Sequence, residues 1–248
     1  MAGVDLLEGS AGAEPALDVA LPHALLGLVA AGRRGPVVRS YRPQPTVAFG
    51  RRDSFLPGFV RAAAAARRRG YTPVIRGAGG RAAAYDDGCL VFDEIMPAAD
   101  SMAGIQARFS EEAGRQAQAL RSLGVDARVG EVPGEYCPGE FSVNARGKTK
   151  LIGAAQRIVR GAWLLSTVVV VEPAGDLRGV LEDVYSELGL GWNPATPGSV
   201  AAEAPGTGVE EVREAILARY ATRAALTPRT LTADERAAAT ELVDRYRV

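Results

Sequence analysis

The stretch from Gly130 to Glu172 constrains the fold of this chain most strongly, because its pattern predicts three consecutive antiparallel strands. Apolar and β-branched residues recur in three short runs, as half-buried strands require. Glycine and charged residues separate the runs and are typical of turns. The predicted strands are residues 141–145, 150–159 and 162–171. The stretch therefore predicts a β-meander, with a cysteine-bearing turn just before it.

The turn before the meander contains Cys137. Pro138 favours an extended backbone at Cys137, because the proline ring crowds the residue before it. Gly134 and Gly139 permit tight turns on either side. Lys150 opens the next strand, and a nearby cation favours the ionised, nucleophilic form of a thiol. We interpret Cys137 and Lys150 as candidate catalytic residues; the alternative is that Cys137 is a buried packing residue, as most intracellular cysteines are.

Small residues follow Lys150 in the predicted second strand. Gly153 and Ala154 leave room for a ligand to lie against the sheet. The turn reads EYCPGEF and the strand GKTKLIGAAQR; upstream lie PTVAFGRRDSFLPGF and GYTPVIRGAGGRAAAYDDG. Together, from about Arg39 to Val171, these motifs resemble the octanoyl and lipoyl amidotransferases, the cysteine-dependent branch of the biotin/lipoate protein ligase superfamily.

The glycine-rich segment of residues 76–82 also fits a dinucleotide-binding pattern, G-x-G-x-x-A after a strand. That pattern requires a helix directly after it, so that the helix N-terminus faces the pyrophosphate. Here residues 86–88 form a turn and a strand follows, so the segment predicts a loop between strands.

The resemblance implies that this loop shapes the acyl-binding site. The residues that we predict to bind the acyl group or substrate are Arg76, Gly79, Gly80, Arg81, Tyr85, Gly153 and Ala154. ATP-dependent ligases of the superfamily carry a second arginine after Arg76 and a histidine near Tyr85. This chain has Gly77 and no histidine there, which suits the cysteine-dependent branch.

The predicted fold class is α+β, because short meanders alternate with amphipathic helices. The resemblance implies the class II aminoacyl-tRNA synthetase/biotin synthetase-like fold, with a largely antiparallel mixed sheet and packed helices. We predict four regions: a disordered tail (1–14), a lipoate ligase/octanoyltransferase-like catalytic domain (15–190), a linker (191–208) and C-terminal helices that pack on the main domain (209–248).

Composition limits the possible partners and compartments. The 29 Lys plus Arg residues balance 29 Asp plus Glu residues, so global charge favours neither nucleic acid nor a membrane surface. No apolar run is long enough to span a bilayer, and the N-terminus lacks the basic residues of a signal peptide. We expect a cytoplasmic protein in which Cys89 and Cys137 are both reduced. His23 is the single histidine and is expected to be structural, which excludes a histidine-rich zinc site.

The resemblance implies an acyltransferase that moves an octanoyl or lipoyl group through a Cys137 thioester to a lysine. The donor would be an acylated carrier protein or the glycine cleavage H protein, and the acceptors would be lipoyl domains of 2-oxoacid dehydrogenases. Transfer would need no metal and no cofactor. Lys150 and the backbone N–H groups of Gly79 and Gly80 would stabilise the oxyanion.

Two alternatives remain open from the sequence. In the first, the chain is an ATP-dependent lipoate-protein ligase in which Lys150 contacts a lipoyl-adenylate and Cys137 is incidental. In the second, it is a non-catalytic superfamily member that binds an acyl group or an acylated protein.

Overall fold

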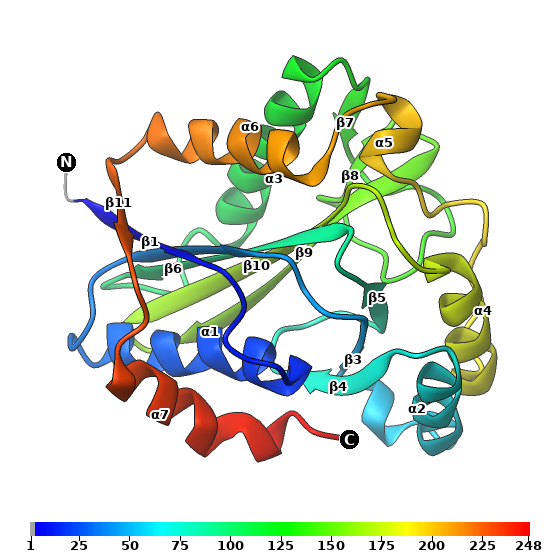
Figure 1. Ribbon diagram of the computed structural model, residues 1–248, viewed down its shortest axis with the longest axis horizontal. Helices are drawn as coiled ribbons and strands as arrows, with labels where there is room; N and C mark the ends of the chain where they lie inside the picture. Colours follow the sequence, from blue (N-terminus) through cyan, green and yellow to red (C-terminus); the bar gives the residue numbers. More distant parts are fainter. Residues whose placement is uncertain (1–2) are drawn as a thin grey trace.

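The computed structural model describes residues 3–248, and an eight-stranded mixed sheet forms its centre. The strands are β1 (Val4–Glu8), β2 (Val37–Tyr41), β6 (Cys89–Pro97), β7 (Ala127–Val129), β8 (Val143–Ala145), β9 (Thr149–Val159), β10 (Ala162–Val170) and β11 (Leu226–Arg229). Their order across the sheet is β11-β1-β2-β6-β10-β9-β8-β7 (Figure 1). β1 is parallel to β2 and β11, and the remaining neighbours are antiparallel.

The predicted meander is confirmed as β8, β9 and β10. β8 begins at Val143 rather than at residue 141, and the other two strands agree with the prediction to within one residue. β9 pairs with β10 from Val159 to Ile152, whereas its other edge pairs with β8 only as far as Ile152. Among residues 3–248, no strand pairs with this edge of the far half of β9, and the edge borders the pocket described below.

A second, three-stranded sheet lies beside the first. It consists of β3 (Thr46–Gly50), β4 (Thr72–Arg76) and β5 (Ala83–Tyr85), in the order β4-β3-β5. The glycine-rich loop connects β4 to β5, so a strand follows it where a dinucleotide-binding loop would have a helix. The predicted loop between strands is confirmed.

Helices cover both faces of the large sheet. α1 (Pro15–Ala30) and α7 (Ala233–Leu242) pack together on one face, and α3 (Ile105–Ser122) and α6 (Val209–Ala221) on the other (Figure 1). α2 (Phe59–Arg68) and α4 (Leu177–Leu188) pack against each other beside the small sheet. This arrangement of a mostly antiparallel sheet with helical layers confirms the predicted α+β class.

The N-terminal segment differs from the expected disordered tail. Residues 1–2 of that tail lie outside the described residues, but β1 follows directly and inserts between β2 and β11. Val4, Leu6 and Leu7 are buried there, which removes their apolar side chains from water. The partner strands lie roughly 30 and 220 residues away in the sequence, so local pattern alone does not indicate this pairing.

The C-terminal third also has more regular structure than the sequence predicts. The expected linker contains a short helix, α5 (Val200–Glu203), and Pro197 forms a bridge with Lys150 of β9. Between the two predicted C-terminal helices, β11 adds the edge strand beside β1, and a 3-10 turn, η2 (Val243–Arg245), follows α7. A four-residue strand that includes Pro228 has too little alternation to be recognised.

Candidate active site

Cys137 occupies a turn between β7 and β8 and has a strained backbone. Its φ angle is 42°, a left-handed conformation that costs a non-glycine residue about 1–3 kcal/mol. The extended backbone predicted from Pro138 is therefore wrong. The reason is tertiary: the Cys137 N–H donates to the Tyr185 hydroxyl (2.8 Å), which itself donates to the Ala82 carbonyl (2.9 Å). These bonds connect the turn to α4 and to the end of the glycine-rich loop just before β5.

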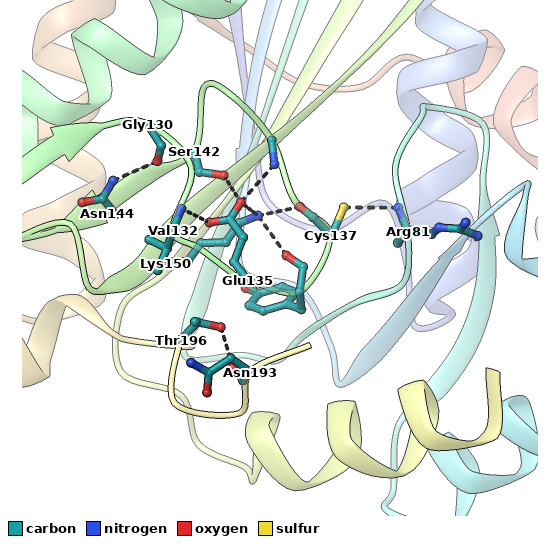
Figure 2. Close-up of polar contacts among 12 residues, drawn as sticks. Arg81, Gly130, Val132, Glu135, Cys137, Ser142, Asn144, Lys150, Asn193 and Thr196 are labelled. Carbon is teal, nitrogen blue, oxygen red and sulfur yellow. Dashed lines mark hydrogen bonds and ion pairs between the residues drawn. The ribbon is translucent and has the colours of Figure 1, made fainter. Parts of the chain in front are cut away.

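The sulfur of Cys137 faces the glycine-rich loop. Its Sγ accepts hydrogen bonds from the Arg81 backbone N–H (3.2 Å) and from Arg76 Nη2 (3.3 Å) (Figure 2 shows the first). The same Nη2 donates to the Arg81 carbonyl (2.7 Å), which fixes the guanidinium against the loop. Gly80 makes this approach possible, because a Cβ there would lie 2.8 Å from Sγ and 2.4 Å from Arg76 Nη2.

These contacts favour the thiolate of Cys137. Burial alone would raise the pKa of the thiol. The positive charges of Arg76 and Lys150, the Arg81 N–H bond and the Arg76 hydrogen bond outweigh burial, so the Cys137 pKa lies below its ordinary value. The sequence predicts the lysine as the activating cation, but the structure adds Arg76 in direct contact with the sulfur.

Lys150 borders the same cavity as Cys137, but its hydrogen bonds go to Glu135 and to the backbone of the cysteine turn. Its Nζ donates to Glu135 Oε1 (3.0 Å), the Tyr136 carbonyl (3.2 Å) and the Cys137 carbonyl (2.7 Å) (Figure 2). The side chain is 3% exposed. The structure therefore brings the two predicted catalytic residues together, through the Cys137 backbone.

A fully buried carboxylate, Glu135, completes this network. Its Oε1 also accepts from the Gly139 N–H (3.0 Å) and the Ser142 hydroxyl (2.5 Å), and its Oε2 accepts from the Val132 N–H (3.1 Å). Sequence reasoning missed Glu135. Neighbouring Glu131 and Glu140 look equivalent in sequence but are exposed, so only burial distinguishes Glu135.

The glycine-rich loop is anchored by the buried carboxylate of Asp53. Arg81 pairs with the buried Asp53 (3.0 Å), whose other oxygen accepts from the Gly50 N–H (2.9 Å). Gly50 itself must lack a side chain, since a Cβ would lie 1.9 Å from the Gly80 carbonyl. Asp53 was also missed, because the motif around it gives no signal for burial.

Residues of the predicted linker brace the site from the other side. The Asn193 N–H donates to the Gly134 carbonyl (2.7 Å), and the Thr196 carbonyl accepts from the Lys150 N–H (2.7 Å). The Gly198 N–H donates to the Lys150 carbonyl (3.0 Å). The predicted linker thus fixes the backbone of both Lys150 and the cysteine turn.

A cavity of about 420 Å³ opens beside Cys137, within the range of small-molecule sites. Gly79 and Gly80 form one wall and Gly153 and Ala154, on the far half of β9, another. The remaining wall is largely apolar and includes Ile105, Phe109, Phe141 and Val168. Such a lining favours an alkyl chain over a charged ligand.

Three predicted substrate-binding residues lie away from the cavity lining: Arg76, Arg81 and Tyr85. Arg76 contacts the thiol and Arg81 offers its backbone N–H, whereas its guanidinium is used by Asp53. Tyr85, which also does not border the cavity, is buried in the core on β5.

His23 lies against Gly77 and stacks on Tyr246, with ring centroids 5.2 Å apart. Burial, assisted by the charge of Arg157, lowers its pKa to about 4, so the ring is neutral near pH 7. Within residues 3–248, no three His, Cys, Asp or Glu side chains are grouped to hold a metal ion. In the same residues, no helix combines the length and apolar character needed to cross a membrane.

The fold and this sequence are those of a known family. Residues 14–220 match the lipoyl protein ligase A/B catalytic domain, and the chain belongs to that family.

Individual relatives agree. The octanoyl-[GcvH]:protein N-octanoyltransferase of Geobacillus kaustophilus (strain HTA426) is 34% identical over 170 residues, which cover 68% of this chain and 60% of that protein. The lipoyl-[GcvH]:protein N-lipoyltransferase of Listeria monocytogenes (serovar 1/2a, strain EGD-e) is 28% identical over 157 residues, 61% of this chain and 55% of that protein. The matched part of the chain thus spans between 55% and 60% of the length of these two relatives.

Solved structures share the fold. Lipoate-protein ligase A bound with ATP gives a TM-score of 0.76 at 23% identity, covering 99% of this chain and 95% of that chain. The bipartite lipoate protein ligase of Thermoplasma acidophilum gives 0.75 at 23% identity, covering 99% and 93%. The predicted superfamily fold is confirmed.

Proposed function

We propose that this protein is an acyltransferase that carries an octanoyl or lipoyl group on Cys137 between two proteins. The observation that carries the proposal is a thiol of lowered pKa at the wall of a largely apolar cavity of about 420 Å³. A thiolate is the reactive nucleophile, and the cavity has the size and lining for a medium-length acyl chain beside it. The names of the relatives, which specify octanoyl or lipoyl transfer from GcvH to protein, support the same reaction.

The reaction has two balanced steps. In the first, the Cys137 thiolate attacks the acyl carbonyl of the donor's acyl-lysine. The C–S bond forms, the C–N bond breaks, and the lysine nitrogen takes a proton from water and leaves as the free amine. In the second, the neutral amine of an acceptor lysine attacks the thioester. The new C–N bond forms, the C–S bond breaks, the amine loses its proton and the thiolate is regenerated. The proton that the acceptor amine releases in this second step restores the balance. Neither step consumes ATP or requires a metal or cofactor.

The donor that we propose is octanoylated glycine cleavage H protein or another acylated carrier protein, and the acceptors are lipoyl domains of 2-oxoacid dehydrogenases. Both would reach the thiol through a second cavity that shares Gly79, Gly80, Gln156 and Ile158 with the acyl cavity. Arg51 and Arg52 border this second cavity and are exposed. A reduced, reactive thiol also fits the cytoplasm, where thiols are kept reduced.

Intact-protein mass spectrometry tests the proposal. Wild type and Cys137→Ser are mixed with octanoylated H protein without ATP. An octanoyl adduct that hydroxylamine removes from wild type, and that the variant lacks, is the expected result. An adduct on neither protein, or acyl transfer that appears only with free octanoate or lipoate and ATP, would contradict it.

A further inference from the structure

Glu135 is a fully buried carboxylate close to the thiol, and the proposed reaction gives it no step. Its side chain is 0% exposed. Its two oxygens accept four hydrogen bonds, from Lys150, Gly139, Ser142 and Val132. These donors lie before the cysteine turn, after it and on β9. One carboxylate therefore connects the chain on both sides of the cysteine turn to β9 (Figure 2).

Lys150 has no donor left for a substrate in this arrangement. An ammonium has three N–H groups, and the three acceptors within reach are Glu135 Oε1 and the carbonyls of Tyr136 and Cys137. Breaking the bond to the buried carboxylate would leave an uncompensated charge in the interior, which is strongly unfavourable. Lys150 thus contributes its charge to the thiol and its hydrogen bonds to the turn.

The backbone of Cys137 needs this support. Its left-handed φ of 42° persists only where surrounding contacts over-determine it. Lys150 holds the carbonyls of residues 136 and 137, while Glu135 holds the Gly139 N–H on the far side of the turn. In this backbone conformation the sulfur reaches the Arg81 N–H and Arg76.

We propose that Glu135 is a positioning residue that fixes Lys150 and the Cys137 turn, so that the sulfur is held against Arg76 and the Arg81 N–H. The proposal deepens the proposed function, since it concerns how the nucleophile of that reaction is held. The positioning of Cys137 affects the reactivity of its thiol in the free enzyme, so it can be tested without an acyl substrate.

The direction in which the alkylation rate of Cys137 changes when Glu135 is neutralised distinguishes a positioning role from a purely electrostatic one. Glu135 is a negative charge near the thiol, and its neutralisation in a rigid site would favour the thiolate and speed its alkylation. If Glu135 instead positions Lys150 and the turn, its loss displaces the cation and the N–H donors, and alkylation slows. A role in folding alone would lower the melting temperature and leave the rate unchanged.

The experiment measures the rate of iodoacetamide alkylation of Cys137 as a function of pH. The variants are Glu135→Gln, Lys150→Met and the double variant, with Glu131→Gln as a matched control, because Glu131 is an exposed carboxylate four residues away. We expect Lys150→Met to react about tenfold more slowly at pH 7, Glu135→Gln about three- to tenfold more slowly, and the control at the wild-type rate. Because Glu135 acts through Lys150, the double variant should react at the Lys150→Met rate.

A faster or unchanged rate in Glu135→Gln, or additive effects in the double variant, would overturn the proposal. If Glu135→Gln does not fold, Ser142→Ala removes one hydrogen bond from the carboxylate with little change in packing, and it should slow alkylation in the same direction by a smaller factor. An unchanged rate in that variant would also overturn the proposal. Slow alkylation in these variants with no acyl transfer by wild type would uphold the positioning role and refute the proposed function.

Discussion

The two cysteines of this chain show what turns a buried thiol into a nucleophile. Cys89 begins β6, is 0% exposed, and its Sγ has Asp86 as its polar neighbour at 3.8 Å. Burial, reinforced by the charges of Asp86 and Asp87, raises the pKa of the Cys89 thiol far above its ordinary value. Cys137 is half-buried, yet Arg76, Lys150 and the Arg81 N–H lower the pKa of its thiol. The sign of the surrounding charge decides the outcome, since desolvation opposes ionisation at both thiols.

The largest effect should come from removing one thiol at a time. Cys137→Ser should reduce octanoyl transfer by at least about 10³-fold, because the hydroxyl is a far weaker nucleophile without a general base. Cys89→Ser should retain transfer, since Cys89 packs in the core and does not border the acyl cavity. Transfer rates of the two purified variants, with peptide mapping of the iodoacetamide-labelled residue, check this difference. Equal losses in both variants would end the distinction between the two thiols.

Removing the cation that contacts the sulfur should raise the pKa of Cys137 towards that of the unreactive Cys89 thiol. Arg76→Gln removes the charge that contacts Sγ, so the Cys137 pKa should rise and alkylation at pH 7 should slow about tenfold. Thiolate content increases with pH, so the rate-pH profile of the variant should shift to higher pH. Arg52→Gln, at an exposed arginine, is the control. A profile that does not move would mean that Arg76 is not the main activating charge.

A single added methyl group should separate the sulfur from its donors. Gly80→Ala places a Cβ 2.8 Å from Sγ at a φ of +101°, and we expect it to slow alkylation several-fold and to cost about 1–3 kcal/mol of unfolding free energy. Gly79→Ala is the matched control, because its Cβ would meet open space, and it should stay within about 0.5 kcal/mol of wild type. Urea denaturation and alkylation kinetics measure both effects. Similar behaviour of the two variants would contradict the close packing at Gly80.

The smallest effect concerns stability at alkaline pH. Burial raises the pKa of Cys89 in the folded protein. Its contribution to the free energy of unfolding is therefore complete below the unfolded thiol pKa of about 8.5. That contribution is lost as pH rises further, because the thiol then ionises only in the unfolded chain. Cys89→Ala should therefore have a flatter alkaline limb, by up to about 1.4 kcal/mol per pH unit.

Cys137 has the opposite sign: its lowered folded pKa gives stability that is present above the unfolded pKa and is lost as pH falls through the folded pKa. Cys137→Ala should thus leave the limb above about pH 9 unchanged, because that thiol is then ionised in both states. Unfolding free energies from urea titrations between pH 6 and roughly 10 measure both effects. Parallel alkaline limbs in Cys89→Ala and wild type would show that burial of Cys89 does not shift its titration.

Local features of this protein can be predicted from residues that lie close together in the chain. Alternation and turn residues predict β8, β9 and β10 closely, and the turn after the glycine-rich loop excludes a dinucleotide site. The sequence motifs also predicted the superfamily and paired Cys137 with Lys150. These features depend on residues close together in the chain, where period and turn chemistry carry the information.

Which groups surround the thiol depends on contacts between segments far apart in the sequence. Arg76 and Tyr185 reach Cys137 from 61 and 48 residues away, and Tyr85 turns out to lie in the core. Burial distinguishes Glu135 from its exposed neighbours and places β1 inside the sheet. Burial and long-range hydrogen bonds depend on packing between distant segments, and the pattern of a single segment does not record that packing.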